Sequence, residues 1–215
     1  MTPPLRFALS QGALLQDAIA ALTAIGCDVA NVTSDERRLL VRNGTLEIVR
    51  ARPSDIATYV ERGAADLGIV GKDVLMESRA RVLELLDLGF GACRFVVAAP
   101  RDAVARSLDE YRHLGSLEVA TKYPNVAERH FRDRGIAVEI VKVAGSAELA
   151  PQVGLADWIV DLVATGATLA ANDLAVVEEI APSTARLIAN PAAYHRRRRE
   201  IAPLVDKLAG WAASR

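Results

Sequence analysis

The stretch that decides the fold is ELAPQVGLADWIVDLVATGATL, which runs from Glu148 to Leu169. Trp158 to Val163 is an apolar strand candidate with one acid, Asp161, near its end. The small-residue loop from Ala164 to Thr168 follows, and a helix can begin directly after it. A loop between a strand and a helix start directs successive backbone N–H groups at one spot, which suits phosphate binding. An ordinary turn built from small residues has the same pattern, so the loop alone leaves both interpretations open.

The residue types in this loop suit a sugar phosphate. Gly166 permits a positive φ or a close approach of the backbone to a ligand. Thr165 and Thr168 add hydroxyl groups that donate hydrogen bonds. Asp161 stands just before the loop, where its carboxylate can hold ribose hydroxyl groups or a magnesium ion.

Length and composition indicate a cytoplasmic globular protein of one large or two small domains. The 215 residues are 51% hydrophobic and 5% aromatic, with a net charge of −1. That charge argues against a nucleic-acid partner, which normally requires a basic protein. The N-terminus lacks the segments of a signal peptide, and no apolar run approaches the ~20 residues of a membrane span. Cys27 and Cys93 are far apart in the sequence, which fits reduced thiols.

Strand patterns alternate with helix patterns along the whole chain. They predict an α/β fold with parallel or mostly parallel sheets, in which ligands bind beyond the C-terminal ends of the strands. Asn43-Gly44 predicts a hairpin. The predicted strands are 5–9, 39–42, 45–50, 65–70, 82–88, 94–99, 118–121, 136–143, 158–163, 176–180 and 186–189. The predicted helices are 15–25, 53–63, one that starts at 74–77, 126–134 and a long final helix after Pro191.

No linker or repeat divides the chain, so two lobes joined by chain crossings are expected. We place the crossings near Gly89 and near Asn172 to Val176. Residues 1–89 together with 176–215 then form a discontinuous first lobe. Residues 90–175 form the second lobe, which carries the loop from Ala164 to Thr168.

Two other predicted strand ends carry cations. Arg50 and Arg52 share one face of an extended segment because their spacing is two. Lys72 follows another buried strand. A cleft with such cations, a phosphate loop and an acid suits a polyphosphate substrate with magnesium, because the guanidinium fork binds phosphate oxygens in pairs. The same residues occur at solvated positions, and that alternative stays open for all three.

The opening stretch as a whole resembles the signature of ATP phosphoribosyltransferase, the first enzyme of histidine biosynthesis. The matching positions are Glu148, Gly154, Ala156, Ile159, Asp161, Leu162, Thr165, Gly166, Thr168 and Leu169. Four further stretches agree: RARPSDIATYVERGAADLGIVGKDVL (50–75), DLGFGACRFVVA (87–98), VATKYPN (119–125) and NPAAYHRRRREI (190–201). The resemblance covers nearly the whole chain. It implies transfer of the phosphoribosyl group from phosphoribosyl pyrophosphate to N1 of ATP, with release of pyrophosphate and with Mg²⁺ as cofactor.

The resemblance also implies a fold and site roles. The fold is two-lobed and like that of a type II periplasmic-binding protein, with the active site in the cleft between the lobes. Asp161, Arg50 and Arg52 are the expected catalytic residues, acting by positioning and charge rather than as nucleophiles. The expected ligands of phosphoribosyl pyrophosphate are Glu148, Asp161, Ala164, Thr165, Gly166, Ala167 and Thr168. The expected ligands of ATP or pyrophosphate are Gln11, Gly12, Arg50, Arg52 and Lys72.

One stretch departs from the family pattern. Family members commonly have Lys-Gly-Arg after the first strand, whereas this chain has Gln11-Gly12-Ala13. Either Arg37, Arg38 or Arg52 replaces the missing cations, or ATP binds more weakly than in the family.

The sequence stops at Arg215 and therefore resembles the short form of the family. The short form implies a separate regulatory subunit similar to the catalytic core of histidyl-tRNA synthetase. It also implies a homodimer within a hetero-oligomer.

Two other functions remain open at this stage. VDLVATGAT also resembles the loop of type I phosphoribosyltransferases that act on a nucleobase or orotate. Those enzymes usually carry two adjacent acids before the loop, whereas Asp161 is followed by Leu162. A small-molecule binding module of the same two-lobed fold is the second alternative, although the missing signal peptide argues against an exported receptor.

Overall fold

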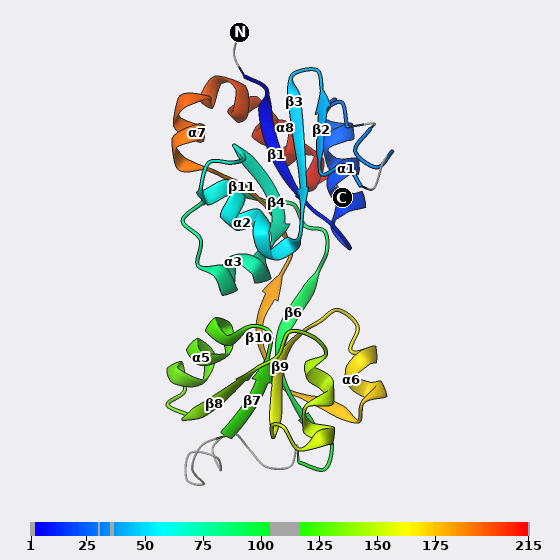
Figure 1. Cartoon of the computed structure of the whole chain (residues 1–215), viewed down its shortest axis with the longest axis vertical. Helices are drawn as coiled ribbons and strands as arrows, with labels where there is room; N and C mark the ends of the chain where they lie inside the picture. Colours follow the sequence, from blue (N-terminus) through cyan, green and yellow to red (C-terminus); the bar gives the residue numbers. More distant parts are fainter. Residues whose placement is uncertain (1–2, 30, 35–36, 104–116, 215) are drawn as a thin grey trace. The chain divides into compact units, whose positions relative to one another are not determined.

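The computed structural model describes residues 3–29, 31–34, 37–103 and 117–214. The chain divides into two compact units, Met1–Ala92 with Thr184–Arg215 and Cys93–Ser183. Each unit is a sheet with helices packed against it (Figure 1). The second crossing falls between Ser183 and Thr184, not near Asn172 to Val176. The reason is that β10 (Leu174–Ser183) pairs along its length with β6 (Cys93–Pro100) and so belongs to the second unit.

Within the described residues, the first unit has a six-stranded sheet. Its strand order is β2 (Leu40–Asn43), β3 (Leu46–Ala51), β1 (Leu5–Ser10), β4 (Leu67–Gly71), β11 (Ala185–Ala189) and β5 (Leu83–Asp87). β1 is parallel to both β3 and β4, and the remaining neighbours are antiparallel. β2 and β3 form the predicted hairpin, with Asn43 opposite Leu46 and Gly44 at a φ of 56°.

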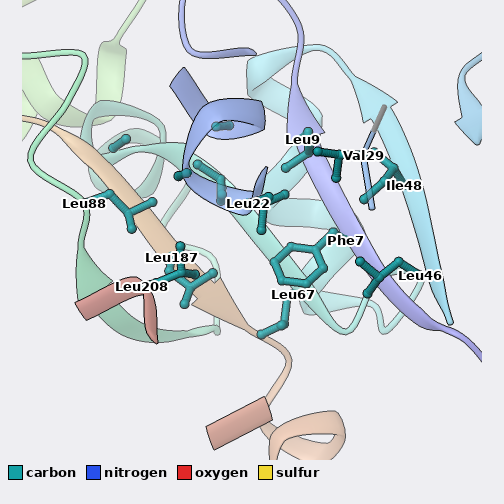
Figure 2. Close-up of a cluster of buried hydrophobic side chains, with 14 of the residues drawn as sticks. Phe7, Leu9, Leu22, Val29, Leu46, Ile48, Leu67, Leu88, Leu187 and Leu208 are labelled. Carbon is teal, nitrogen blue, oxygen red and sulfur yellow. The ribbon is translucent and has the colours of Figure 1, made fainter. Parts of the chain in front are cut away.

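Both faces of this sheet are covered by helices. Phe7 and Leu9 belong to the cluster under α1 (Leu15–Ala24) and α8 (Arg198–Ala213), shown in Figure 2. Ala8 instead packs with residues of α2 (Pro53–Glu61), because successive strand residues face opposite sides of a sheet. α3 (Lys72–Ser78) contributes partly buried side chains to that second cluster.

The long final helix that the sequence predicts is two helices, α7 (Pro191–Arg196) and α8. They are separated at Arg197, whose backbone has a φ of −113° and a ψ of 22°. The Arg197 guanidinium donates to Asp66 Oδ2 at 3.0 Å and to the carbonyl groups of Pro3 and Pro4. These long-range bonds anchor the Arg197 side chain at the break between the two helices. The apolar side of α8 packs into the core, with Ile201 and Leu208 fully buried.

Within the described residues, the second unit has a five-stranded sheet. Its order is β10, β6, β9 (Trp158–Val163), β7 (Leu117–Thr121) and β8 (Val138–Lys142). β7 is parallel to β8 and β9, whereas β6 is antiparallel to β9 and β10. The unit also contains α5 (Pro124–Asp133), α6 (Ala167–Ala171) and the short 3-10 turns η1 (Ala147–Leu149) and η2 (Pro151–Val153).

The α/β class and the two-sheet architecture are as predicted, but the sheets are mixed rather than mostly parallel. Among the described strand pairs, four are parallel and five are antiparallel. The alternation of strands and helices in the sequence does not predict these mixed directions. Whether a pair is parallel or antiparallel depends on which strands become neighbours in the sheet. Across the described ranges, no helix combines the length and the apolar character that crossing a membrane requires.

Candidate active site

The central strand β9 positions the candidate site. It lies between β6 and β7, and the residues from Trp158 to Asp161 are buried. The end of β9 opens onto a cavity of about 270 Å³. The cavity is lined by Glu148, Asp161, Leu162, Val163, Ala164, Thr165, Gly166, Ala167, Thr168 and Leu169. All seven residues expected to bind phosphoribosyl pyrophosphate therefore lie on one concave surface.

The loop after β9 bends sharply at Gly166, which has a φ of 83°. α6 begins at once, and its Ala170 N–H donates to the Gly166 carbonyl at 3.0 Å. Thr165 and Thr168 are exposed, so their hydroxyl groups are accessible to a ligand. A positive-φ bend between two hydroxyl groups in a concave site is an arrangement that fits a phosphate.

Asp161 is the buried acid of the site, with 4% of its surface exposed. Its Oδ1 accepts a hydrogen bond from the Leu162 N–H at 2.8 Å and lies 3.7 Å from Lys122 Nζ. Burial raises the pKa of the Asp161 carboxyl, the Leu162 N–H and Lys122 lower it, and Glu148 raises it further. A carboxyl group perturbed by burial and by neighbouring charges within a cavity is typical of a functional site.

Glu148 approaches the cavity from η1. This turn is held by Ala147 and Ala150, which are buried in the apolar cluster that also contains Leu169. The same cluster thus supports both the acid and the start of α6. Within the described residues, no group of three or more His, Cys, Asp or Glu forms a metal cluster. Asp161 and Glu148 are the carboxylates that line the cavity.

Lys122 is a residue of this site that sequence reasoning missed. It follows β7, which runs parallel to β9 with Thr121 opposite Val160. The residue after Thr121 is therefore level with Asp161. The pattern VATKYPN predicts a strand and its loop, but it does not tell which strands are neighbours in the sheet.

Arg50 lies in the first unit, where its guanidinium is engaged by backbone carbonyl groups. It is buried, with 7% of its surface exposed. Its guanidinium donates to the carbonyls of Val32 and Arg38 at 3.1 and 3.4 Å. Arg50 therefore fastens the segment before β2 to β3. Arg52 lies just past β3, where it is the N-cap residue of α2 in an extended conformation, with a φ of −63° and a ψ of 148°.

Lys72 is likewise engaged within the first unit. Its Nζ lies 2.5 Å from Glu84 Oε2, and Glu84 also faces Arg186 at 3.5 Å. Arg186 in turn pairs with Asp87 at 2.8 Å. Lys72 thus belongs to a charge network between the start of α3, β5 and β11, which competes with phosphate for its ammonium group.

Arg52, Gln11 and Gly12 occupy neighbouring strand ends in the first unit. The Gln11 N–H donates to the Ala51 carbonyl at 2.9 Å, and β1 pairs with β3 up to Ser10 and Ala51. Arg52 and Gly12 are exposed, and Gly12 has a φ of 88°. Of the three cations expected to bind phosphates, Arg52 has the most accessible side chain.

We expect Arg50→Met to destabilise the protein by about 2 kcal/mol, because the buried carbonyl of Val32 and the part-buried carbonyl of Arg38 lose their donor. Arg52→Met serves as the matched control, since Arg52 is exposed. Urea unfolding followed by circular dichroism measures both variants. Equal stability of the two would show that the guanidinium of Arg50 is not an anchor.

The fold and the site together define a class: two-sheet α/β proteins of the periplasmic-binding-protein type that carry a small-residue loop beyond a central strand. Structural similarity extends to the aliphatic sulphonate binding protein of Escherichia coli, with a TM-score of 0.62 at 13% identity, covering 99% of this chain and 74% of that one. At that identity the likeness concerns the fold alone.

The family is set by closer similarities. The family model of ATP phosphoribosyltransferase (HisG) matches residues 52–210. The ATP phosphoribosyltransferase of Rubrobacter xylanophilus is 49% identical over 201 residues, covering 94% of this chain and 93% of that protein. The enzyme of Moorella thermoacetica is 50% identical over 213 residues, covering 97% and 93%. The chain belongs to the ATP phosphoribosyltransferase family, whose reaction is the first step of histidine biosynthesis.

A solved structure agrees in fold along the whole chain. It is the ATP phosphoribosyl transferase (HisG:HisZ) complex from Thermotoga maritima, with a TM-score of 0.84 and 30% identity. The match covers 98% of this chain and 100% of that one. The two chains therefore share one fold over nearly their full lengths.

Proposed function

We propose that the chain transfers the phosphoribosyl group of phosphoribosyl pyrophosphate to N1 of ATP, giving phosphoribosyl-ATP and pyrophosphate. The observation that carries this proposal is the cavity at the end of β9. This cavity is lined by the seven residues that we expect to bind phosphoribosyl pyrophosphate, in a chain of this family. The cavity combines a loop for the 5-phosphate with a buried acid for the ribose.

Each part of the cavity has a role in this reaction. The loop from Ala164 to Thr168 binds the 5-phosphate through its N–H groups and the threonine hydroxyl groups. Asp161 accepts hydrogen bonds from the ribose hydroxyl groups, and Glu148 supports that end of the sugar. The bond from ribose C1 to the diphosphate oxygen breaks, and N1 of adenine supplies the electron pair for the new bond. Positive charge grows on the ribose as diphosphate leaves, and the Asp161 carboxylate stabilises it.

The cofactor in this proposal is Mg²⁺, held mainly by the oxygen atoms of the substrate diphosphate. Two carboxylates in the cavity fit an ion that arrives with its substrate rather than one bound by the protein alone. When bound, magnesium neutralises charge on the leaving diphosphate.

Arg52 is the first-unit cation that we assign to the diphosphate or to the phosphates of ATP. We expect Arg52→Ala to lower kcat/KM about 10- to 100-fold, because a charge-assisted hydrogen bond contributes roughly 1.5–3 kcal/mol. Thermal unfolding should stay unchanged, since the side chain is exposed. Steady-state kinetics with each substrate varied in turn measures the effect. Wild-type kinetics in this variant would move the role to Lys72 or to Arg37 and Arg38.

We also propose that this chain works as a homodimer within a hetero-oligomer. Its partner is a regulatory subunit similar to the catalytic core of histidyl-tRNA synthetase. The support is the Thermotoga maritima structure, which is a complex of two kinds of chain. We place the assembly in the cytoplasm, where ATP and phosphoribosyl pyrophosphate are available.

The test of the proposed function is product formation. The chain, with and without the regulatory partner, is mixed with ATP, phosphoribosyl pyrophosphate and Mg²⁺, and the near-ultraviolet absorbance of phosphoribosyl-ATP is followed. We expect turnover with both substrates that stops when EDTA is added. No product in the presence of the partner would contradict the proposal. Product from orotate or a free purine, but not from ATP, would favour a type I-like activity instead.

A further inference from the structure

We propose that Lys122 is a positioning residue for Asp161, whose ammonium group holds the buried carboxylate in the charged form that ribose hydroxyl groups require. This role presupposes the function proposed above. Lys122 stands outside the stretch from Glu148 to Leu169. Its side chain approaches Asp161 from the end of the neighbouring strand β7.

The backbone around Lys122 is fixed to the strand that carries Asp161. The Thr121 hydroxyl donates to the Val160 carbonyl at 2.7 Å and accepts from the Tyr123 N–H at 2.9 Å. Thr121 is fully buried. The Thr121 hydroxyl thus ties both Thr121 and Tyr123 to β9. Lys122 lies between these two residues and beside Asp161.

The side chain of Lys122 is held from two directions. Its Nζ lies 3.7 Å from Asp161 Oδ1 and 6.0 Å from the centre of the Tyr123 ring. The Tyr123 ring packs edge-on against Phe95, which is buried, at a centroid distance of 4.8 Å. Both the carboxylate of Asp161 and the aromatic ring of Tyr123 attract the ammonium group of Lys122.

The charges around Asp161 leave it dependent on Lys122. Glu148 from η1 acts as a like charge, and the loop after β9 contributes hydroxyl groups but no cation. On β6, the residue opposite Asp161 is the apolar Val96. Among the described residues, Lys122 is the cation within ion-pair distance of this carboxylate. Without it, burial and Glu148 would favour protonation, and a neutral carboxyl group is a weaker acceptor for ribose.

The distance between Lys122 Nζ and Asp161 Oδ1 indicates that Lys122 is not a fixed hydrogen-bond partner of Asp161. At 3.7 Å the contact is longer than a hydrogen bond, so Lys122 acts on Asp161 through charge. The lone pairs of the carboxylate that the Leu162 N–H does not use remain available to the two ribose hydroxyl groups.

The experiment compares Lys122→Met, Lys122→Arg and Lys207→Met. The first removes the charge, the second keeps it, and the third removes a lysine charge from an exposed position on α8. The pKa of Asp161 is read by carboxyl ¹³C NMR, with the resonance assigned by its loss in Asp161→Asn. The pH profile of kcat/KM for phosphoribosyl pyrophosphate is measured with the regulatory partner present.

We expect Lys122→Met to raise the pKa of Asp161 by about one pH unit, allowing for the partial exposure of the ammonium group. The acid limb of the kcat/KM profile should move by the same amount. Lys122→Arg should restore both readouts, and Lys207→Met should match the wild type. An unchanged pKa in Lys122→Met would overturn the inference. A loss of kcat/KM that is uniform in pH, with the acid limb unmoved, would overturn it too, because Lys122 would then contact substrate directly. If the wild type forms no phosphoribosyl-ATP, the proposed function fails. The NMR titration needs no turnover, so it still shows whether Lys122 lowers the pKa of Asp161.

Discussion

Asp161→Asn should lower kcat/KM for phosphoribosyl pyrophosphate about 100-fold. Asparagine keeps the size of the side chain and an oxygen for the Leu162 N–H, so the change removes charge and little else. A hydrogen bond to a charged group contributes roughly 1.5–3 kcal/mol, and each 1.36 kcal/mol is a factor of ten in rate. Initial rates of phosphoribosyl-ATP formation measure the loss.

The same variant should be as stable as the wild type, or more stable. Because the pKa of Asp161 is raised in the folded protein, the folded state binds the proton more tightly than the unfolded chain. The stabilising contribution of this group is complete below the ordinary value of 3.8 and is lost as pH rises through the folded pKa. At neutral pH the ionised carboxylate therefore lowers stability. Asp161→Asn removes that penalty, so its advantage in melting temperature should grow between acidic and neutral pH.

The control for this variant is Asp133→Asn, an identical chemical change at the end of α5. Asp133 is 63% exposed and its ion pair with Arg132 is long, at 3.8 Å, so neither activity nor stability should change. Equal activity of Asp161→Asn and Asp133→Asn would remove Asp161 from the ribose site. A strong loss of stability in Asp161→Asn would instead identify a structural acid.

The predicted site residues of the second unit lie together in one cavity, and there is a physical reason why the sequence could predict this. The residues from Asp161 to Thr168 are contiguous in sequence, so local rules for strands, turns and glycine conformation suffice to place them. Glu148 was the one distant member, and the family resemblance rather than any pattern placed it there.

Arg50 and Lys72 show where local reasoning ends. The alternation of side chains along a strand does not tell whether a charged residue binds a ligand or contacts another residue of the protein. Arg50 has its partners at Val32 and Arg38, and Lys72 has its partner at Glu84. Lys122 shows the converse, since its importance depends on β7 being the neighbour of β9. Each case turns on contacts between residues far apart in the chain.

Gly166→Ala should raise KM for phosphoribosyl pyrophosphate at least about 10-fold, because an L residue at positive φ costs roughly 1–2 kcal/mol of backbone strain. A Cβ at Gly166 would meet Val163 Cγ1 at 3.9 Å, which is an ordinary contact. The effect therefore arises from the bend itself: the loop relaxes away from the φ of 83° and moves its N–H groups, so binding must restore the strained bend. Calorimetry with ribose 5-phosphate should show the same loss, since this ligand carries the 5-phosphate without the diphosphate.

Gly135→Ala separates strain from function. Gly135 has a φ of 68°, lies after α5 in the same unit, and has open space where its Cβ would be. The two substitutions should lower the melting temperature to a similar extent, because both place a side chain at positive φ. Gly166→Ala alone should impair ribose 5-phosphate binding. If Gly135→Ala weakened binding equally, the loss would reflect general destabilisation of the unit. If neither variant weakened binding, the loop would not be holding the 5-phosphate, and the phosphate would have to bind at another part of the chain.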